Sequence, residues 1–233
     1  METKSNIPKP EKAQLIRKIV GRFTVIPVFI GITVLLPAGT FNYWQFYAYL
    51  ATIVLPMLLV LFYFLKKDPK FLERRLRSNE KEKAQKIIQI VFSIFFFSIF
   101  VVSGFDKRFA WSNIATELVI ATDLIVLAGY YIIFKVFQQN SYASRIVEVE
   151  ENQQVISTGI YAWVRHPMYV GVIIMYLPVP IALGSWWALI PAISIPLGLV
   201  FRILNEEKVL KQNLPGYTNY CKQTKYRLVP YIW

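Results

Sequence analysis

The chain has a single cysteine and a single histidine among its 233 residues. One cysteine, Cys221, excludes an intramolecular disulfide and any site built from several thiolates. With His166 as the only histidine, the ligand set of a dedicated zinc or haem site is also missing, and we expect no metal. A cleavable signal peptide is not expected either, because the first residues are polar and basic and lack an apolar core.

Apolar residues, in contrast, are abundant. Hydrophobic residues make up 55% of the chain and aromatic residues 16%, with a mean hydropathy of +0.42, and these values exceed those of average soluble domains. They predict an all-α integral membrane protein, because helices satisfy their own backbone polar groups inside a bilayer. We expect about six transmembrane helices, within a range of five to seven, each with roughly twenty apolar residues to cross ~30 Å of hydrocarbon. The candidate segments are 19–38, 43–65, 86–104, 113–137, 168–184 and 186–204.

The net charge of +12 is distributed unevenly. Lys and Arg gather in the N-terminal segment and in the loop 66–86, whereas the loop 105–112 holds only Lys107 and Arg108. The positive-inside rule therefore predicts that both termini, the loop 66–86 and the connector 138–167 face the cytoplasm. The same surplus can bind anionic lipid headgroups, and its placement argues against nucleic acid as a partner.

Local patterns predict where helices break and where the chain turns. The loop 66–86 mixes both charges and predicts a solvated helix, and the alternation of polar and apolar residues over 145–150 predicts a short extended segment. Turns are expected at 157–159, at 184–185 and at 214–217, where a short helix ends. Four prolines predict broken or kinked helices in the last two apolar segments: Pro178, Pro180, Pro191 and Pro196.

The only histidine lies in a polar block that precedes an apolar segment, Arg165-His166-Pro167-Met168-Tyr169-Val170-Gly171. Pro167 can open a helix at its first turn. The free amide groups of a helix start favour anions, and Arg165 adds a fixed cation. The block therefore suits a ligand with a carboxylate or phosphate. The alternative is that Arg165 and His166 only cap a membrane span at the level of the headgroups.

A second polar cluster, Arg202-Ile-Leu-Asn-Glu206-Glu207, ends the last apolar segment. Its acidic groups could hold an amine while Arg202 holds an acidic group, so one helix end would present both signs of charge. The alternative is a solvated ion pair between Arg202 and Glu206, which stabilises a helix by only ~0.2–0.5 kcal/mol.

Two acidic residues fall in the fourth apolar segment, Glu117 and, deeper, Asp123. Ionisable groups at such positions usually face a bundle interior or a cavity. Asp123 is therefore a secondary site candidate. Pairing with a Tyr or Thr of the bundle is the simpler interpretation.

The chain from about Asn140 to Trp233 resembles the isoprenylcysteine carboxyl methyltransferase and phospholipid methyltransferase superfamily. The resemblance rests on an ordered set of short motifs rather than on any one of them. They are Thr158-Gly159-Ile160-Tyr161, the Arg165–Gly171 block, Arg202-x-x-x-Glu206-Glu207, Leu214-Pro215-Gly216-Tyr217-x-x-Tyr220 and Arg227-Leu228-Val229-Pro230.

The resemblance implies transfer of a methyl group from S-adenosylmethionine to a lipid or prenylated acceptor in the membrane, either a carboxylate or an amine. Residues 1–137 would form an N-terminal bundle of four spans that shapes the acceptor's access. Residues 138–233 would form the catalytic region, with a cofactor pocket facing the cytoplasm. Arg202, near the acceptor, and Glu206 are the implied catalytic residues. The implied cofactor contacts are Gly159, Tyr161, Arg165, His166, Pro167, Tyr169, Glu206, Glu207 and Tyr217.

Two other classes of protein remain open. Sterol-reductase-like membrane enzymes, which use NADPH, can show a related Arg-His-Pro-x-Tyr block. Theirs is usually followed by further polar residues, whereas 170–174 are apolar here. A non-enzymatic membrane module would instead use Asp123 as its pathway residue. Cofactor binding distinguishes the three: S-adenosylmethionine, NADPH or neither.

Overall fold

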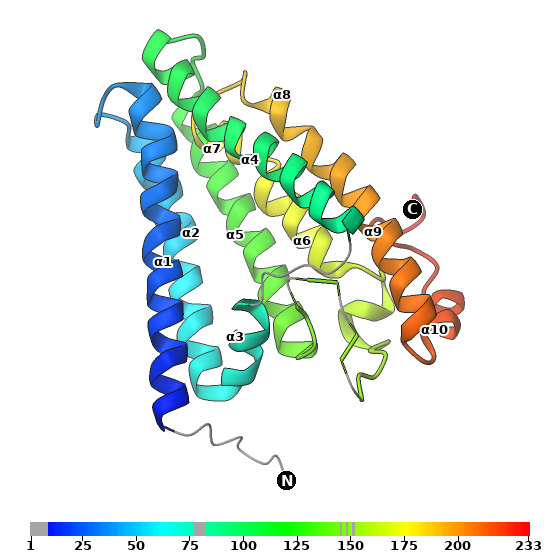
Figure 1. Ribbon diagram of the computed structural model, residues 1–233. Helices are drawn as coiled ribbons and strands as arrows, with labels where there is room; N and C mark the ends of the chain where they lie inside the picture. The colour runs from blue at the N-terminus through cyan, green and yellow to red at the C-terminus, as the bar shows by residue number, and fades with distance from the viewer. Residues whose placement is uncertain (1–8, 77–82, 145, 148, 151) are drawn as a thin grey trace.

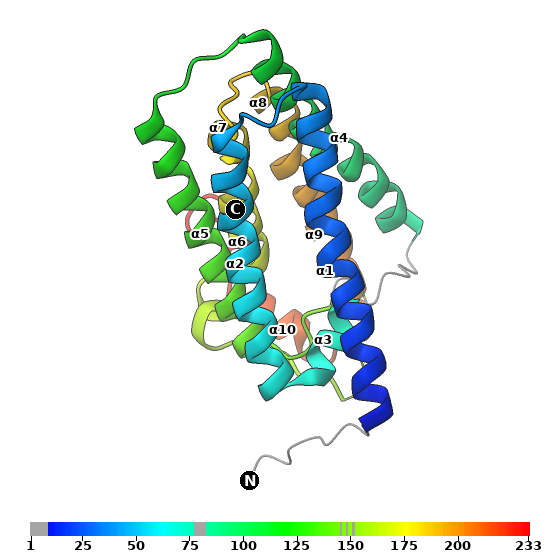
Figure 2. The ribbon, with the colours of Figure 1, turned by 90° about the vertical axis from the view of Figure 1, so that its left-hand side faces the viewer.

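The computed structural model describes residues 9–76, 83–144, 146–147, 149–150 and 152–233, and the described chain is helical and contains no strand (Figure 1). The longer helices stand side by side as a bundle (Figure 2). The elements are α1 (Lys9–Ala38), α2 (Trp44–Lys67), α3 (Pro69–Leu76), α4 (Lys83–Phe109), α5 (Thr116–Gln139), the 3₁₀ helix η1 (Gly159–Ala162), α6 (Pro167–Tyr176), α7 (Val179–Ala182), α8 (Leu189–Ala192), α9 (Ser194–Asn213) and α10 (Tyr217–Gln223).

Five helical segments of the described chain are long and apolar enough to cross a membrane, which fits a multi-pass membrane protein. They are Ile16–Ala38, Trp44–Lys67, Lys86–Phe109, Thr116–Gln139 and Leu189–Asn213. The count lies at the lower end of the predicted range, because the segment predicted at 168–184 forms a shorter apolar stretch, Pro167–Ala182.

The predicted breaks at proline are confirmed in this shorter stretch and in the segment that returns from it. The chain between α6 and α7 is interrupted at Pro178, and Pro180 lies in the first turn of α7. Pro196 lies in the first turn of α9, where a missing N–H costs little because those amides have no partner within the helix. The helix at the end of the chain is longer than predicted: α9 continues past 204 to Asn213, and the turn at 214–217 ends this membrane helix itself.

α5 and α6 pack closely, and glycine makes the approach possible. A Cβ atom on Gly129 of α5 would lie 2.6 Å from the Met175 nitrogen and 2.8 Å from the Gly171 oxygen, both on α6. Small residues at such crossings let two membrane helices approach backbone to backbone. Because α6 begins with the polar block, this contact places that block at the end of α5.

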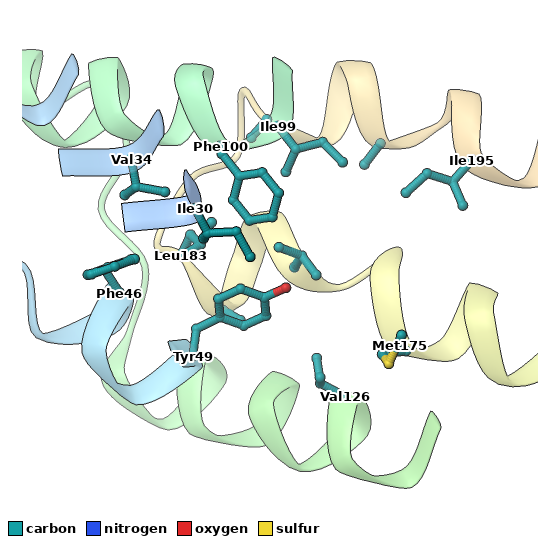
Figure 3. Close-up of a cluster of buried hydrophobic side chains, with 14 of the residues drawn as sticks. Ile30, Val34, Phe46, Tyr49, Ile99, Phe100, Val126, Met175, Leu183 and Ile195 are labelled. Atoms are coloured by element: carbon teal, nitrogen blue, oxygen red, sulfur yellow. The ribbon is translucent and has the colours of Figure 1, made fainter. Parts of the chain in front are cut away.

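A hydrophobic core holds the bundle around this pair of helices (Figure 3). Its side chains come from all the long helices, so the ends of α6 and α9 are held in one arrangement. The labelled members are Ile30 and Val34 of α1, Phe46 and Tyr49 of α2, Ile99 and Phe100 of α4, Val126 of α5, Met175 of α6, Leu183 at the end of α7, and Ile195 of α9.

The two ends of the bundle differ in kind. At one end, buried Asp106 accepts hydrogen bonds from the Ser112 amide (2.7 Å), the Ser112 hydroxyl (2.6 Å) and the Ser185 hydroxyl (2.5 Å), which closes the bundle with a compact polar cap. The opposite end carries α3, α10 and the connector 140–158 (Figure 1).

A helix is confirmed in the loop 66–86 as α3, but it is not solvated on all sides, because Phe71 and Leu72 are buried; 77–82 lie outside the described residues. α3 holds the connector: Arg74 donates to Glu150 (3.0 Å) and to the Ser141 carbonyl oxygen (2.9 Å), and Arg75 donates to that of Ser144 (2.9 Å). The extended segment predicted at 145–150 is not a strand in its described residues, and positions 145 and 148 lie outside them.

Gly129→Ala tests the close approach of α5 and α6. The added methyl group meets backbone atoms that cannot rotate away, so we expect a loss of about 1–3 kcal/mol of stability. Thermal unfolding of the detergent-purified protein measures the change. Gly21→Ala on α1, where an added Cβ meets nothing within 4 Å, is the matched control. Equal unfolding temperatures for the two variants would contradict the proposed packing.

Candidate active site

A pocket lies at the α3 and α10 end of the bundle, between the connector and the ends of α6 and α9. Its volume is about 120 Å³, several times the ~10–15 Å³ that one water molecule needs. It can therefore admit part of an organic ligand. The lining comprises Asn140, Tyr142, Ala143, Ser144, Ile146, Val147, Gln153, Gln154, Val155, Ile156, Tyr161, Arg165, His166, Pro167, Met168, Tyr169, Arg202, Glu206, Leu210, Leu214, Tyr217 and Tyr220.

Most of the residues predicted for the site line this one pocket. The structure brings together the polar block at the start of α6, the tyrosines of η1 and α10, and the polar end of α9. Two predicted residues, Gly159 and Glu207, are outside the lining. The sequence placed the connector in the catalytic region but did not predict its apolar residues for the site. The connector contributes an apolar wall of Ile146, Val147, Val155 and Ile156.

The polar block is anchored at the start of α6 by the C-terminal segment. His166 is the N-cap residue and Pro167 occupies the first turn, as predicted. The amide of Arg165 donates to the Tyr226 oxygen (2.9 Å), and that of His166 donates to the Arg227 oxygen (3.0 Å). These backbone bonds fix where the two side chains leave the chain.

Glu207 is the centre of a buried charge cluster behind the pocket wall. Its side chain is only 3% exposed. It accepts hydrogen bonds from Arg165 Nε (2.7 Å) and Arg227 Nε (3.1 Å), and His166 Nε2 lies 3.3 Å away. A buried carboxylate is stable only when it is paired in this way. Glu207 therefore links α9 to the start of α6 and to the C-terminal segment.

Arg165 is engaged by the protein as well as by the pocket. Besides Glu207, its guanidinium donates to the backbone oxygens of Thr224 and Lys225, both at 2.9 Å. Three donor contacts are therefore directed toward the protein. Arg165 therefore mainly links segments of the protein. Only the N–H groups of its guanidinium that are not used in these contacts can bind a ligand.

Tyr169 links the other two charged residues. Its hydroxyl donates to Glu206, and Arg202 Nε donates to the same hydroxyl at 2.9 Å. Arg202 and Glu206, for which a solvated ion pair was the alternative interpretation, thus both contact a residue of α6. The His166 ring stacks beside Tyr169 with centroids 5.7 Å apart, and its Nδ1 lies 3.9 Å from Glu206. This chain of polar groups faces the pocket.

Two tyrosines contribute hydroxyl groups to the opposite wall. The Tyr217 hydroxyl is buried and has no hydrogen-bond partner among the described residues. Burial raises the pKa of Tyr217, and burial likewise raises the pKa of Tyr161 to about 12. Both side chains are consequently neutral hydroxyls at physiological pH and can donate to a ligand.

Gly159 supports the pocket from outside the lining. It adopts φ +59°, a conformation that favours glycine. The side chain of Gln139, at the end of α5, lies directly against it. Gln139 and Asn140 were not predicted for the site. The only signal in the sequence is a run of amides, Gln138-Gln139-Asn140, that ends an apolar helix.

Asp123 lies away from the pocket, in the interior of α5. Thr52 of α2 lies close enough to interact with its side chain, while Oδ1 has no partner among the described residues. The pairing with a Thr of the bundle agrees with the simpler interpretation. Within the same described chain, no cluster of three or more His, Cys, Asp and Glu side chains is arranged to hold a metal ion.

Comparison with known proteins shows what this part of the chain is similar to. Residues 117–215 match the family model described as phospholipid methyltransferase. The match confirms the resemblance to the superfamily of integral-membrane isoprenylcysteine and phospholipid methyltransferases. It spans α5 to α9, and so includes most of the pocket. No curated protein matches the chain.

Removing the buried carboxylate of Glu207 tests whether it holds α9, the start of α6 and the C-terminal segment together. Glu207→Ala leaves Arg165 and Arg227 without their shared partner, and breaking a buried pair in this way costs about 3–5 kcal/mol. We expect a large drop in the unfolding temperature, measured in detergent with and without ligand. Glu117→Ala, at an exposed position of α5, is the control and should unfold as the wild type does. Wild-type stability in Glu207→Ala would show that the cluster does not hold the segments together.

Proposed function

We propose that the protein transfers a methyl group from S-adenosylmethionine to a lipid acceptor in the membrane. The observation that carries the proposal is the pocket itself, which joins a partly exposed carboxylate and buried hydroxyl groups at the end of apolar helices. A methyltransferase family implies a methyl donor of this type. The residues that line the pocket should then match the chemical groups of S-adenosylmethionine.

The lining has counterparts for several parts of S-adenosylmethionine. The Glu206 side chain is 22% exposed and can accept from an amine or a ribose diol. The apolar wall of the connector suits an adenine ring. The hydroxyl of Tyr217 supplies a donor that lacks a protein partner. The tyrosine rings can lie against a cationic sulfonium. The fit supports the proposal.

The polar chain at the mouth of the pocket suits the reaction. Bound S-adenosylmethionine supplies an already activated methyl group, so catalysis requires mainly positioning and exclusion of water. Arg202 and Glu206, held by Tyr169, would orient the acceptor's polar group. A carboxylate acceptor needs no base, whereas an amine must first lose a proton, for which Glu206 is within reach of the pocket. The matched family favours a lipid over a prenylated protein as acceptor.

Binding of S-adenosylhomocysteine to the purified protein is the first test. Calorimetric titration, with NADPH titrated in parallel, should show saturable binding of S-adenosylhomocysteine alone. Binding of NADPH alone would point to a reductase, and binding of neither to a folded sample would contradict enzymatic use of this pocket. Transfer of labelled methyl groups to extracted membrane lipids then identifies the acceptor.

Tyr169→Phe separates catalysis from binding in the same assay. The variant keeps the buried ring and removes the hydroxyl between Arg202 and Glu206. Because small misplacements at a reacting centre cost roughly 10²-fold in rate, we expect turnover to fall far more than affinity for S-adenosylhomocysteine. Wild-type turnover in Tyr169→Phe would show that the link between Arg202 and Glu206 is not needed for methyl transfer.

We further propose that the pocket faces the cytoplasm, as the basic loop 66–86 predicts. The test uses a Cys221→Ser background with one new cysteine at either end: Lys70→Cys on α3 and Phe41→Cys at the opposite end, both exposed positions. In sealed right-side-out vesicles, an impermeant maleimide should label position 41 and reach position 70 only after permeabilisation. The reverse pattern would invert the orientation.

A further inference from the structure

The turn that leads into the pocket is held by one side chain from the end of α5. Gln139 Nε2 donates to the Thr158 oxygen (2.5 Å), and Gln139 Oε1 accepts from the Ile160 amide (3.2 Å). The two bonded groups lie on either side of Gly159. One amide side chain therefore satisfies the backbone of the turn from both sides, as a neighbouring strand would.

Gly159 allows this contact for two reasons. Its φ of +59° is one that residues with a Cβ rarely adopt. An added Cβ would also lie 2.4–2.8 Å from the three end atoms of the Gln139 side chain. The contact between Gly159 and Gln139 thus connects η1 to the end of the membrane helix α5.

The next residue of the same helix end contacts the pocket tyrosine directly. Asn140 Nδ2 donates to the Tyr161 hydroxyl at 2.8 Å, and Asn140 Oδ1 accepts from the Tyr142 amide at 3.0 Å. The second bond fixes which way the amide faces. Asn140 therefore presents a donor, and not an acceptor, to Tyr161.

The direction of this bond leaves the hydroxyl proton of Tyr161 available. A phenol oxygen can accept from Asn140 while its own O–H donates elsewhere. Among the described residues, the Tyr161 hydroxyl forms no hydrogen bond besides the one from Asn140, and Tyr161 lines the pocket. The rest of the residue is held in place, because its backbone oxygen accepts from the Tyr220 hydroxyl (2.8 Å) and from Thr224 Oγ1 (3.3 Å).

We propose that Asn140 orients Tyr161 as a hydrogen-bond donor to an acceptor atom of the bound methyl donor, and that Gln139 holds the turn that carries Tyr161. Both are positioning residues: they act on cofactor affinity through Tyr161 and leave the methyl-transfer step unchanged. The inference rests on the proposed function, because it requires S-adenosylmethionine in this pocket. It makes the end of α5 part of cofactor recognition.

Asn140→Asp reverses the bond without changing the shape of the side chain. The new carboxylate accepts the Tyr161 proton, which is then withdrawn from the ligand, while the bond from the Tyr142 amide is kept. We expect the Kd for S-adenosylhomocysteine and the KM for S-adenosylmethionine to rise roughly 3- to 10-fold, the loss of one hydrogen bond. The kcat at saturating donor should stay at the wild-type value.

A double-mutant cycle shows whether the effect passes through the hydroxyl. Tyr161→Phe should weaken binding about as much as Asn140→Asp, and the double variant should lose no more than either alone. Gln138→Glu is the control for added charge, since the same kind of change falls two residues before Asn140, at an exposed position of α5. Losses that add up in the double variant, or unchanged affinity in Asn140→Asp, would overturn the inference.

Gln139 is tested by hydrogen exchange, which needs no ligand. Gln139→Ala removes the acceptor of the Ile160 amide, so exchange at that amide should accelerate while amides in the middle of α5 exchange as before. Unchanged exchange would overturn the role of Gln139. The wild-type titration separates this inference from the proposed function: no binding of S-adenosylhomocysteine ends both, whereas wild-type binding with unchanged affinity in Asn140→Asp ends the inference alone.

Discussion

The site depends on one buried carboxylate. Glu207 lies on α9, Arg165 precedes α6, and Arg227 belongs to the C-terminal segment, yet all three meet behind the pocket wall. A charge removed from water must be paired, because leaving it alone costs several kcal/mol. Pairing Glu207 with both arginines therefore constrains how these three segments are placed relative to one another. The stereochemistry of the pocket follows from that electrostatic requirement.

The membrane bundle supplies the frame on which this pairing can occur. The close approach of α5 and α6 at Gly129 and Gly171 brings the end of α5 beside the start of α6. α5 ends in amide side chains that bind η1, so the helix that crosses the bilayer also forms part of the pocket. At the other end, the Asp106 cap closes the bundle. The polar site is built at the end of helices that the apolar core holds together.

Several features of the site were predictable because each depends on neighbours in the sequence. Pro167 opens α6, and a helix start of this kind follows from proline's fixed φ and missing N–H. The polar residues Arg202 and Glu206 lie one turn apart on α9, so they were bound to share a face. Other features were not predictable. The Tyr169 link between them joins two helices, and the withdrawal of Glu207 behind the wall depends on Arg227, twenty positions away along the chain.

The sequence by itself determined the helical class, the long apolar helices, the breaks at proline and the family resemblance that the match over residues 117–215 confirms. These properties follow from hydrophobicity, helix period and backbone geometry, all of which act within a few residues. Only the tertiary structure decided that Pro167–Ala182 is a short broken stretch and that Gln139 and Asn140 belong to the site. It also decided that the Arg165 guanidinium donates mainly to groups of the protein, namely Glu207 and two backbone oxygens. Those outcomes depend on which groups are paired once water is excluded, and pairing of that kind is settled by packing between distant segments.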